Sequence, residues 1–118
     1  MTQSTKFIYH LAPGNRWANW PEDQAYVPAE YAADGFIHCT AGDDLMLQVA
    51  NTFYRQSSSD FVLLVIDPSR VMASVKWEQS DDALATVFPH IYGPISRDAV
   101  AEVRRVLRDA DGTFMGWQ

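Results

Sequence analysis

The sequence predicts a single α+β domain, in which a split or mixed sheet is accompanied by two to three helices. Two observations lead to this fold class. Strand-like apolar runs outnumber helix-like ones, and the expected order β-α-β-α-β-β-β-α-β does not alternate as a doubly wound parallel sheet requires. The chain also has 118 residues, the usual size of one domain, and no repeat or linker divides 1–118 into two parts.

The first third of the chain is expected to hold two strands and a short helix. The run 7–11 is rich in β-forming residues and stops at a Pro-Gly-Asn turn. An aromatic loop follows over 16–27. A helix is expected over 28–33, since its first residue is a proline, which a first helical turn tolerates. An Asp-Gly turn then leads into a second strand over 36–40.

The middle third is expected to form one amphipathic helix and one buried strand. Two aspartates can cap a helix over 45–55. Leu45, Val49 and Phe53 recur at four-residue spacing, and with Met46 and Ala50 beside them they form one apolar stripe on this helix. The run 61–66 contains six apolar residues in succession, as is typical of a central strand buried on both faces.

The last third is expected to contain three strands and one helix. The run 75–78 alternates with period two, so we expect a strand with one wet face and with Trp77 in the core. The run 88–95 contains two prolines, which favour the edge or rim of a sheet. Valines at helical spacing predict a helix over 97–109, and a turn then leads to a short strand over 113–116.

Net charge, cysteine content and hydropathy exclude several classes of protein. A net charge of −6 argues against general nucleic-acid binding, which depends on Lys and Arg contacts to phosphates. Cys39 is the only cysteine, so no intramolecular disulfide can form. The first residues lack the apolar segment of a signal peptide, and no run approaches the ~20 apolar residues of a membrane span. We therefore expect a cytoplasmic protein without a membrane partner.

Three histidines are the strongest candidates for chemistry, and each lies in a strand-like run. Residues two apart on a strand share a face, so His38 lies on the side of Thr40, and His90 lies on the side of Tyr92. We expect a cleft lined by polar side chains from these runs, namely His10, His38, Thr40, Glu78, His90 and Tyr92. Imidazole donates, accepts or carries a proton near neutral pH, which suits catalysis or phosphate contact.

Alternative interpretations of these residues stay open. Each histidine can be a hydrogen-bonded core residue. The three can also ligate zinc, although gaps of 28 and 52 residues provide no tight ligand spacing. Trp17 and Trp20 can stack on a planar ligand or pack on the core, and Cys39 is expected in the core. Gly93-Pro94 precedes the last predicted helix, whose N-terminus would offer amide groups to an anion.

Six motifs over nearly the whole chain carry a resemblance to a known family. They are Ile8-Tyr9-His10-Leu11-Ala12, Asp34-Gly35-Phe36-Ile37-His38-Cys39-Thr40, Val49-Ala50-Asn51 with Phe53-Tyr54, Leu63-Leu64-Val65-Ile66-Asp67, Val75-Lys76-Trp77-Glu78 and Phe88-Pro89-His90-Ile91-Tyr92-Gly93-Pro94-Ile95. In type and order these motifs resemble the small bacterial family of domain of unknown function 952 (DUF952). The resemblance implies no particular reaction.

A more distant resemblance is to the fold of the ADP-ribosyltransferases, especially the RNA 2′-phosphotransferases that use NAD. Those proteins carry a first-strand Tyr-His-Gly-Thr motif and a later His-x-His-Leu-Ser motif. Tyr9-His10 matches the first in part, and Ile37-His38-Cys39-Thr40 matches the second in part. The resemblance implies that His10 holds the ribose next to nicotinamide, with His38 and Thr40 across the cleft.

The chain also departs from that pattern. Leu11-Ala12 stand where the relatives have Gly-Thr, which removes a close backbone approach and a hydroxyl ligand. Glu78 and the His90/Tyr92 pair compete for the position of the glutamate of the ADP-ribosyltransferases. The arginines with which RNA phosphotransferases grip RNA phosphate are missing, so that particular activity is not expected.

The resemblance therefore implies an ADP-ribosyltransferase-like split or mixed sheet and a transferase or glycohydrolase that uses NAD or another nucleotide. In that function the implied catalytic residues are His10, His38, Glu78 and His90, and the implied ligand-binding residues are Tyr9, Thr40, Tyr92 and Trp17. A non-catalytic module that binds a nucleotide or phosphorylated ligand is the alternative, which the missing Gly-Thr favours. A metal hydrolase with histidine ligands is the second alternative.

Overall fold

The computed structural model describes residues 7–80 and 86–118, and within them it contains seven strands and three α-helices. The strands are β1 (Ile8–Pro13), β2 (Ile37–His38), β3 (Phe61–Ile66), β4 (Ser74–Gln79), β5 (Val87–Tyr92), β6 (Val100–Arg108) and β7 (Phe114–Trp117). The helices are α1 (Gly14–Asn19), α2 (Tyr31–Asp34) and α3 (Asp43–Phe53), with 3-10 turns η1 (Pro68–Arg70) and η2 (Arg97–Ala99). The predicted α+β class and helix number are confirmed.

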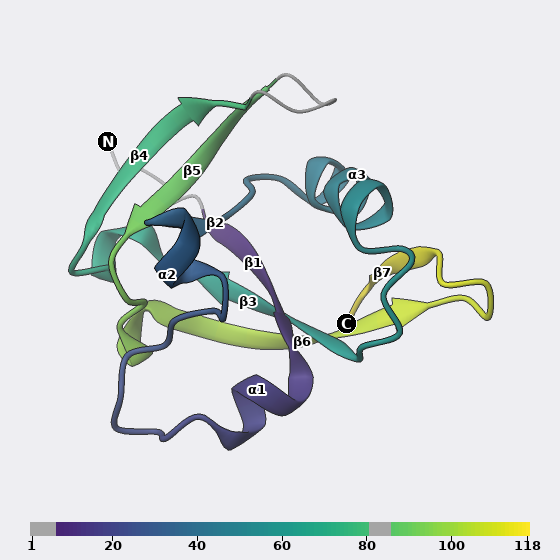
Figure 1. The fold of residues 1–118 in the computed structure, drawn as a ribbon, viewed down its shortest axis with the longest axis horizontal. Coiled ribbons are helices and arrows are strands. Elements are labelled where there is room, and N and C mark those ends of the chain that lie inside the picture. The colour runs from purple at the N-terminus through teal and green to yellow at the C-terminus, as the bar shows by residue number, and fades with distance from the viewer. Residues whose placement is uncertain (1–6, 81–85) are drawn as a thin grey trace, which may run out of the picture.

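The strands are divided between two sheets (Figure 1). The larger sheet has the order β1-β3-β6-β7, and the smaller one has the order β2-β5-β4. Every strand pair within the described residues is antiparallel, so the sheet is split but not mixed. In the smaller sheet His38 stands directly opposite His90, and Lys76 stands opposite His90 on the other side. This register brings side chains from three strands to one face.

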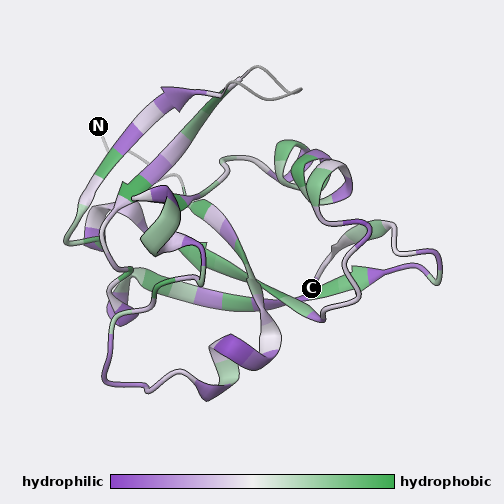
Figure 2. Ribbon diagram, viewed as in Figure 1, coloured by the Kyte–Doolittle hydropathy of each residue, from purple (hydrophilic) through white to green (hydrophobic). Residues whose placement is uncertain are grey.

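The larger sheet is buried on both faces at β1 and β3. One face joins a core cluster with Ile37, Ile91 and Tyr26, and the other joins a second cluster with Met46 of α3 and Phe114 of β7. Side chains of β3 therefore contribute to both cores, as the unbroken apolar run predicted. Figure 2 shows that β3 is hydrophobic along its length, whereas α3 alternates between hydrophobic and hydrophilic residues.

The chain passes from the smaller sheet to the larger one directly after β2. A strand was expected over 36–40, but β2 covers only two of these residues. Thr40 then pairs with Tyr9 of β1, with N–H to carbonyl distances of 2.7 and 2.8 Å in the two directions. The predicted helix 28–33 is also shifted, because residues 28–30 form a turn and α2 ends at Asp34. The next residue, Gly35, has a φ of 80°, which favours glycine.

The predicted helix over 97–109 is wrong. This segment forms η2 and then the nine-residue strand β6, which lies between β3 and β7. Its three valines are spaced by three residues, a pattern that a helix and a partly exposed strand both accept. Pairing decides between them, since β6 supplies the second hydrogen-bonded neighbour of β3. The anion site expected at a helix N-terminus after Gly93-Pro94 is therefore also wrong.

Three smaller expectations are corrected as well. The predicted loop 16–27 begins inside α1. Trp77 is 55% exposed on the outer face of β4, so it is not a core residue. The run 88–95 was expected at a sheet edge, yet β5 is the central strand of its sheet. Proline has no N–H to donate to a neighbouring strand. The Pro89 carbonyl accepts from the Cys39 N–H just beyond the end of β2, so the position that lacks a donor lies where the pairing of β5 with β2 ends.

The helix α3 packs on the core through one side of the predicted apolar stripe. Met46 and Ala50 are the buried residues of α3, while Leu45 and Val49 are partly buried and Phe53 is 48% exposed. Val49 still packs against the second core cluster, whereas Phe53 lies outside the core. Val49 and Phe53 also line the pocket described below.

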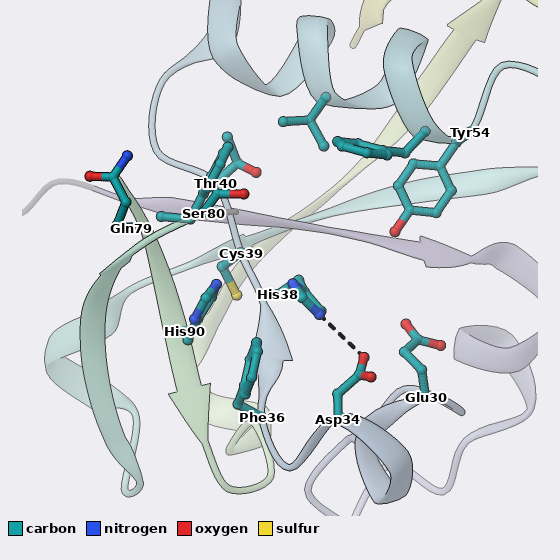
Figure 3. A pocket seen from close by; sticks show the side chains of 13 residues that line it. Glu30, Asp34, Phe36, His38, Cys39, Thr40, Tyr54, Gln79, Ser80 and His90 are labelled. Carbon is teal, nitrogen blue, oxygen red and sulfur yellow. Dashed lines mark hydrogen bonds and ion pairs between the residues drawn. The ribbon is translucent and has the colours of Figure 1, made fainter. Parts of the chain in front are cut away.

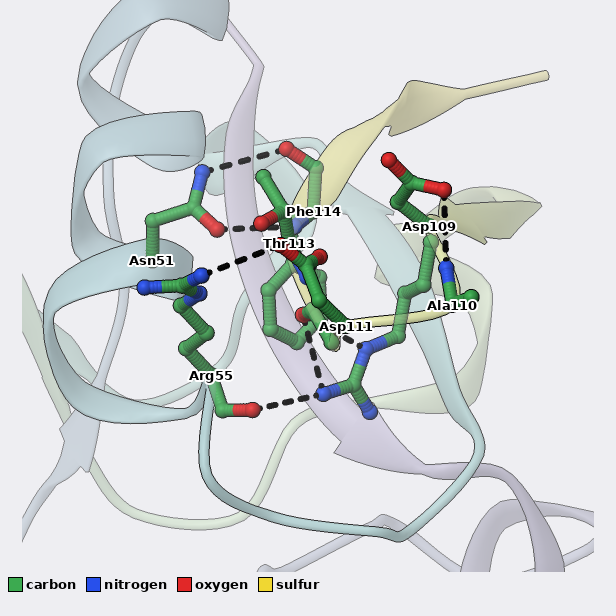
Figure 4. A network of polar contacts seen from close by, with 9 residues as sticks. Asn51, Arg55, Asp109, Ala110, Asp111, Thr113 and Phe114 are labelled. Atoms are coloured by element: carbon green, nitrogen blue, oxygen red, sulfur yellow. Dashed lines mark hydrogen bonds and ion pairs between the residues drawn. The ribbon is translucent and has the colours of Figure 1, made fainter.

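The end of α3 is fastened to the β6–β7 hairpin by polar contacts (Figure 4). The Asn51 amide donates to the Phe114 carbonyl at 3.1 Å, and its oxygen accepts from the Phe114 N–H at 2.7 Å. The Arg55 guanidinium bonds the Asp111 carboxylate at 3.1 Å, and Arg108 donates to the Arg55 carbonyl at 3.0 Å. This network fixes the helix that forms one wall of the pocket.

None of the helices in the described part of the chain has the length and hydropathy needed to cross a bilayer.

Candidate functional site

A pocket of about 620 Å³ lies between α3, α2 and the smaller sheet (Figure 3). This volume is in the range of small-molecule and cofactor sites. Thirteen described residues line it, namely Glu30, Asp34, Phe36, His38, Cys39, Thr40, Val49, Phe53, Tyr54, Gln79, Ser80, Phe88 and His90. Among the residues predicted for a site, the pocket thus brings together His38, Thr40 and His90.

His90 is the buried imidazole of the pocket, and it is held from two sides. Its Nδ1 lies 2.8 Å from Oε1 of Glu78, and its ring stacks on the Phe36 ring with centroids 4.2 Å apart. Since a carboxylate only accepts hydrogen bonds, Nδ1 is the protonated nitrogen. Nε2 is then the nitrogen that can accept a proton or hydrogen bond from a ligand.

Glu78 and Tyr92 lie behind His90 and do not line the pocket. The Tyr92 hydroxyl donates to the same Oε1 of Glu78 at 2.5 Å. The hydrogen bonds from Tyr92 and then from His90 hold the pKa of the Glu78 carboxyl below its ordinary value. Donation to this carboxylate raises the pKa of Tyr92. We call Tyr92, Glu78 and His90 the relay, because hydrogen bonds connect them in sequence to the pocket.

His38 is the second imidazole of the pocket and has its own carboxylate. Its side chain is 55% exposed, and its Nε2 lies 3.2 Å from Oδ2 of Asp34, the last residue of α2. The His38 ring lies edge-on to the His90 ring, with centroids 5.3 Å apart. Both rings contact Phe36. The pocket therefore contains two imidazole–carboxylate pairs in contact with one aromatic ring, an arrangement suited to passing protons to and from a bound molecule.

His10 lies in the core beneath β2 and not in the pocket lining. Its Nδ1 donates to the His38 carbonyl at 2.7 Å, and its ring lies beside Tyr26. Burial lowers the pKa of His10. Within the described structure, its Nε2 has no hydrogen-bond partner. His10 thus supports the backbone of His38 from behind, and its predicted contact with a ribose stays untested.

Three of the predicted ligand-binding residues do not line the pocket, whereas Thr40 does. Tyr9 lies on the face of β1 opposite to His10, and its hydroxyl donates to the Asp43 carboxylate at 2.7 Å. Trp17 packs edge-on against Tyr26, with the Arg97 guanidinium over its other side at 4.2 Å. The aromatic loop thus packs against the core at this point. Tyr92 reaches the pocket only through Glu78 and the Phe36 ring.

Sequence reasoning missed the acidic and aromatic part of the lining. Glu30 and Asp34 come from the turn before α2 and from α2 itself, and Phe36, Phe53 and Tyr54 supply exposed ring surface. Asp34 precedes His38 by four residues, a spacing that could have signalled the pair. Glu30 and Tyr54 carried no local signal, because only the fold brings α2 and the end of α3 together. Cys39 lines the pocket as a buried thiol whose pKa burial raises.

The pocket contains no obvious place for a metal ion. No group of three histidine, cysteine or carboxylate side chains in residues 7–80 and 86–118 is arranged to hold one. His10 directs Nδ1 to a carbonyl, and the other two histidines each bond a different carboxylate. The described histidines do not converge as a three-histidine zinc site requires, because His10 lies in the core outside the pocket lining.

The comparisons with known proteins assign the chain to a family. The family model described as "Protein of unknown function (DUF952)" matches residues 11–103. The crystal structure of protein CC0527 from Caulobacter crescentus has a TM-score of 0.77 at 28% identity, covering 92% of this chain and 93% of that one. The crystal structure of a double mutant of CC0527 gives the same values. The solution NMR structure of CC0527 gives a TM-score of 0.69 at 30% identity, covering 90% of this chain and 89% of that one.

No curated protein matches the chain. The matches reported above include no ADP-ribosyltransferase, so that resemblance stays a prediction. The match to the family model covers most of the chain, in agreement with the order of the motifs. The chain therefore belongs to the DUF952 family of proteins of unknown function.

Proposed function

We propose that this protein is an acid–base enzyme that binds a nucleoside-sized substrate in the pocket and cleaves an N-glycosidic bond. This is the glycohydrolase form of the NAD- or nucleotide-using activity expected from the sequence. The observation that carries the proposal is the relay, in which Tyr92 and Glu78 hold the His90 imidazole at the wall of a pocket of suitable size. Carboxylates that orient a histidine in this way stabilise the imidazolium that forms when it accepts a proton.

His90 acts as the general base in this proposal. Its Nδ1–H is directed to Glu78, so Nε2 takes the proton of a water molecule as the water oxygen attacks the sugar carbon. The new C–O bond forms while the bond from that carbon to the leaving nitrogen breaks. Positive charge that develops on the sugar is stabilised by the nearby carboxylates of Glu30 and Asp34, which line the same pocket.

His38 acts as the general acid. When the substrate is a neutral nucleoside, His38 in its protonated form, paired with Asp34, gives a proton to the leaving base while His90 receives one from water. The two imidazoles then exchange protonation states and are reset by solvent. A pyridinium base, as in NAD, leaves as a neutral molecule without this proton, and His90 passes the proton from water to solvent. His10 is a positioning residue here, because its hydrogen bond to the His38 carbonyl fixes the strand that carries the acid.

Product formation tests the proposal directly. Purified protein is incubated with NAD, nicotinamide riboside and a set of purine and pyrimidine nucleosides, and free base is measured by chromatography. ADP-ribose, which lacks the nicotinamide and keeps the adenine, serves as a binding control in calorimetry. The Glu78→Gln variant should lose about 10²-fold or more of the rate, the usual contribution of a positioned acid or base. Glu102→Gln is the matched control, because Glu102 is a carboxylate on β6 paired with Arg104 and remote from the pocket lining.

The outcomes separate this proposal from the alternatives. Release of a base that falls with Glu78→Gln and not with Glu102→Gln supports it. Tight binding of a nucleotide with no released base after an hour selects the non-catalytic binding module instead. The absence of both heat and product for all of these compounds at millimolar concentration refutes it.

A further inference from the structure

The aromatic and acidic side chains that the relay does not use also form part of the pocket wall. We infer that the pocket selects a small organic cation, such as a quaternary ammonium or N-alkylpyridinium group. The inference rests on the proposed function, since it names the class of substrate seated in the same site. Cation binding would depend on the lining residues only, so it can be measured separately from base release.

Exposed aromatic surface is concentrated at the end of α3. Phe53 is 48% exposed although the buried stripe of α3 is already complete with Met46 and Ala50. The adjacent Tyr54 ring descends from the helix end, and both residues line the pocket (Figure 3). Two ring residues at a pocket wall provide the electron-rich faces to which cations bind within about 6 Å of a ring centroid.

Negative charge lies opposite these rings. Figure 3 shows the Tyr54 hydroxyl directed towards the Glu30 carboxylate, with the Asp34 carboxylate beside it. Burial raises the pKa of Tyr54, and the charges of Glu30 and Asp34 raise it further. The field of both carboxylates therefore reaches the aromatic wall. A cation seated between the ring and these carboxylates would be attracted from both sides.

Lysine and arginine are missing from the described part of the lining. Of the thirteen described residues around the pocket, none is Lys or Arg. Lys76 lies over the Tyr92 ring, 4.9 Å from its centroid, behind the relay and outside the lining. Phosphate groups are usually bound by Arg, Lys or helix N-termini, so this lining disfavours an anionic group. NAD would then enter by its pyridinium end, with the pyrophosphate outside the pocket.

Choline and its neutral isostere 3,3-dimethyl-1-butanol test the inference, because the two molecules differ chiefly in one positive charge. Binding is measured by calorimetry and by chemical-shift changes in a two-dimensional NMR spectrum of the full chain. We expect choline to bind at least about tenfold more tightly than the isostere, with shifts at the residues of the lining. Added salt should reduce this preference, and inorganic phosphate should not bind in the pocket.

Variants assign the preference to the proposed groups. The Glu30→Gln/Asp34→Asn double variant should reduce choline affinity about tenfold and leave the isostere unchanged. Phe53→Leu should weaken choline several-fold, since it removes the ring from an exposed position and keeps an apolar side chain. Glu102→Gln should have no effect. The NMR spectrum of each variant reports whether it is folded, and the wild-type comparison of choline with the isostere needs no variant.

Equal affinity for choline and the isostere, or no pocket shifts with either, overturns the inference. Tighter binding of phosphate than of choline overturns it as well. Glu78→Gln separates the two proposals: it should slow base release by about 10²-fold or more and keep the preference for choline. A choline preference without any base release in the wild-type protein leaves the cation site standing and removes the glycohydrolase.

Discussion

Acidification is expected to destabilise the protein through His10. The imidazole is buried in β1, bonds the His38 carbonyl through Nδ1, and has no hydrogen-bond partner for Nε2 among the described residues. Protonation would place a charge on Nε2 in a site without an acceptor. Burial accordingly lowers the pKa of His10 in the folded state. The perturbation is a fall in pH from about 8 to about 5, which passes the ordinary histidine pKa of about 6.5.

The size of the effect follows from proton linkage. Above about pH 6.5 the imidazole is neutral in both the folded and the unfolded chain, so it causes no pH dependence. Below that value the unfolded chain binds a proton that the folded chain does not. The free energy of unfolding then falls by up to about 1.4 kcal/mol for each pH unit, until the pH reaches the lowered pKa of the folded state.

The His10→Asn variant isolates this contribution. Its side-chain amide can replace Nδ1 as the donor to the His38 carbonyl, but it does not titrate. Urea unfolding followed by tryptophan fluorescence gives the free energy of unfolding of both proteins at several pH values. The smaller side chain should cost about 2 kcal/mol or more at about pH 8. The advantage of the wild type should then shrink by about 1.4 kcal/mol per unit below about pH 6.5.

A constant difference between the two proteins from about pH 8 to about pH 5 would refute this reasoning. It would mean that His10 binds its proton equally well in the folded and unfolded states. A difference that grows on acidification would reverse the sign and indicate a buried partner for the imidazolium. Other titrating groups cancel in the subtraction, provided that they keep their surroundings in the variant.

Three further predictions concern the core and the pocket walls. Phe114→Ala should lower the free energy of unfolding by about 3–5 kcal/mol in urea titrations, because the ring is almost fully buried; a loss below about 1 kcal/mol would contradict its place in the second core. Asn51→Ala should cost about 1–3 kcal/mol, since it removes both hydrogen bonds to the Phe114 backbone. Gln48→Ala, on an exposed face of the same helix, should change the free energy of unfolding by less than about 0.5 kcal/mol. Equal losses in Asn51→Ala and Gln48→Ala would argue against a stabilising role of the Asn51 hydrogen bonds. The Cys39 thiol should resist Ellman's reagent in the folded protein and react in urea, because burial raises its pKa; rapid labelling of the native state would show that the thiol is accessible.

Local patterns predicted much of the fold. The apolar run that forms β3 appears in the sequence as a strand buried on both faces, because such a strand needs apolar residues at every position. The two-residue periodicity also placed His90 and Tyr92 on one face, where both are linked to Glu78. The Asp-Gly turn before β2 agrees with the positive φ of Gly35. Each of these features depends on neighbours within a few residues.

Long-range pairing decided the features that were predicted wrongly. Valines at positions 100, 103 and 106 fit one face of a helix, yet this segment is β6 because β3 has an open hydrogen-bonding edge there. Pro89 indicated an edge strand, but β5 is central because the short β2 ends before the missing donor matters. A local pattern cannot report the partner on which such a choice depends.

The sequence by itself determined the α+β class and the family, since strand periodicity and short motifs can be recognised without a structure. It offered three histidines for one cleft, and two of them, His38 and His90, line the pocket. Only the tertiary structure separated His10 from them, because the direction of its side chain depends on the strand packed above β1. It also brought Glu30 and Asp34 to the aromatic end of α3. The charge and the shape of the pocket depend on contacts between distant segments, which no local pattern contains.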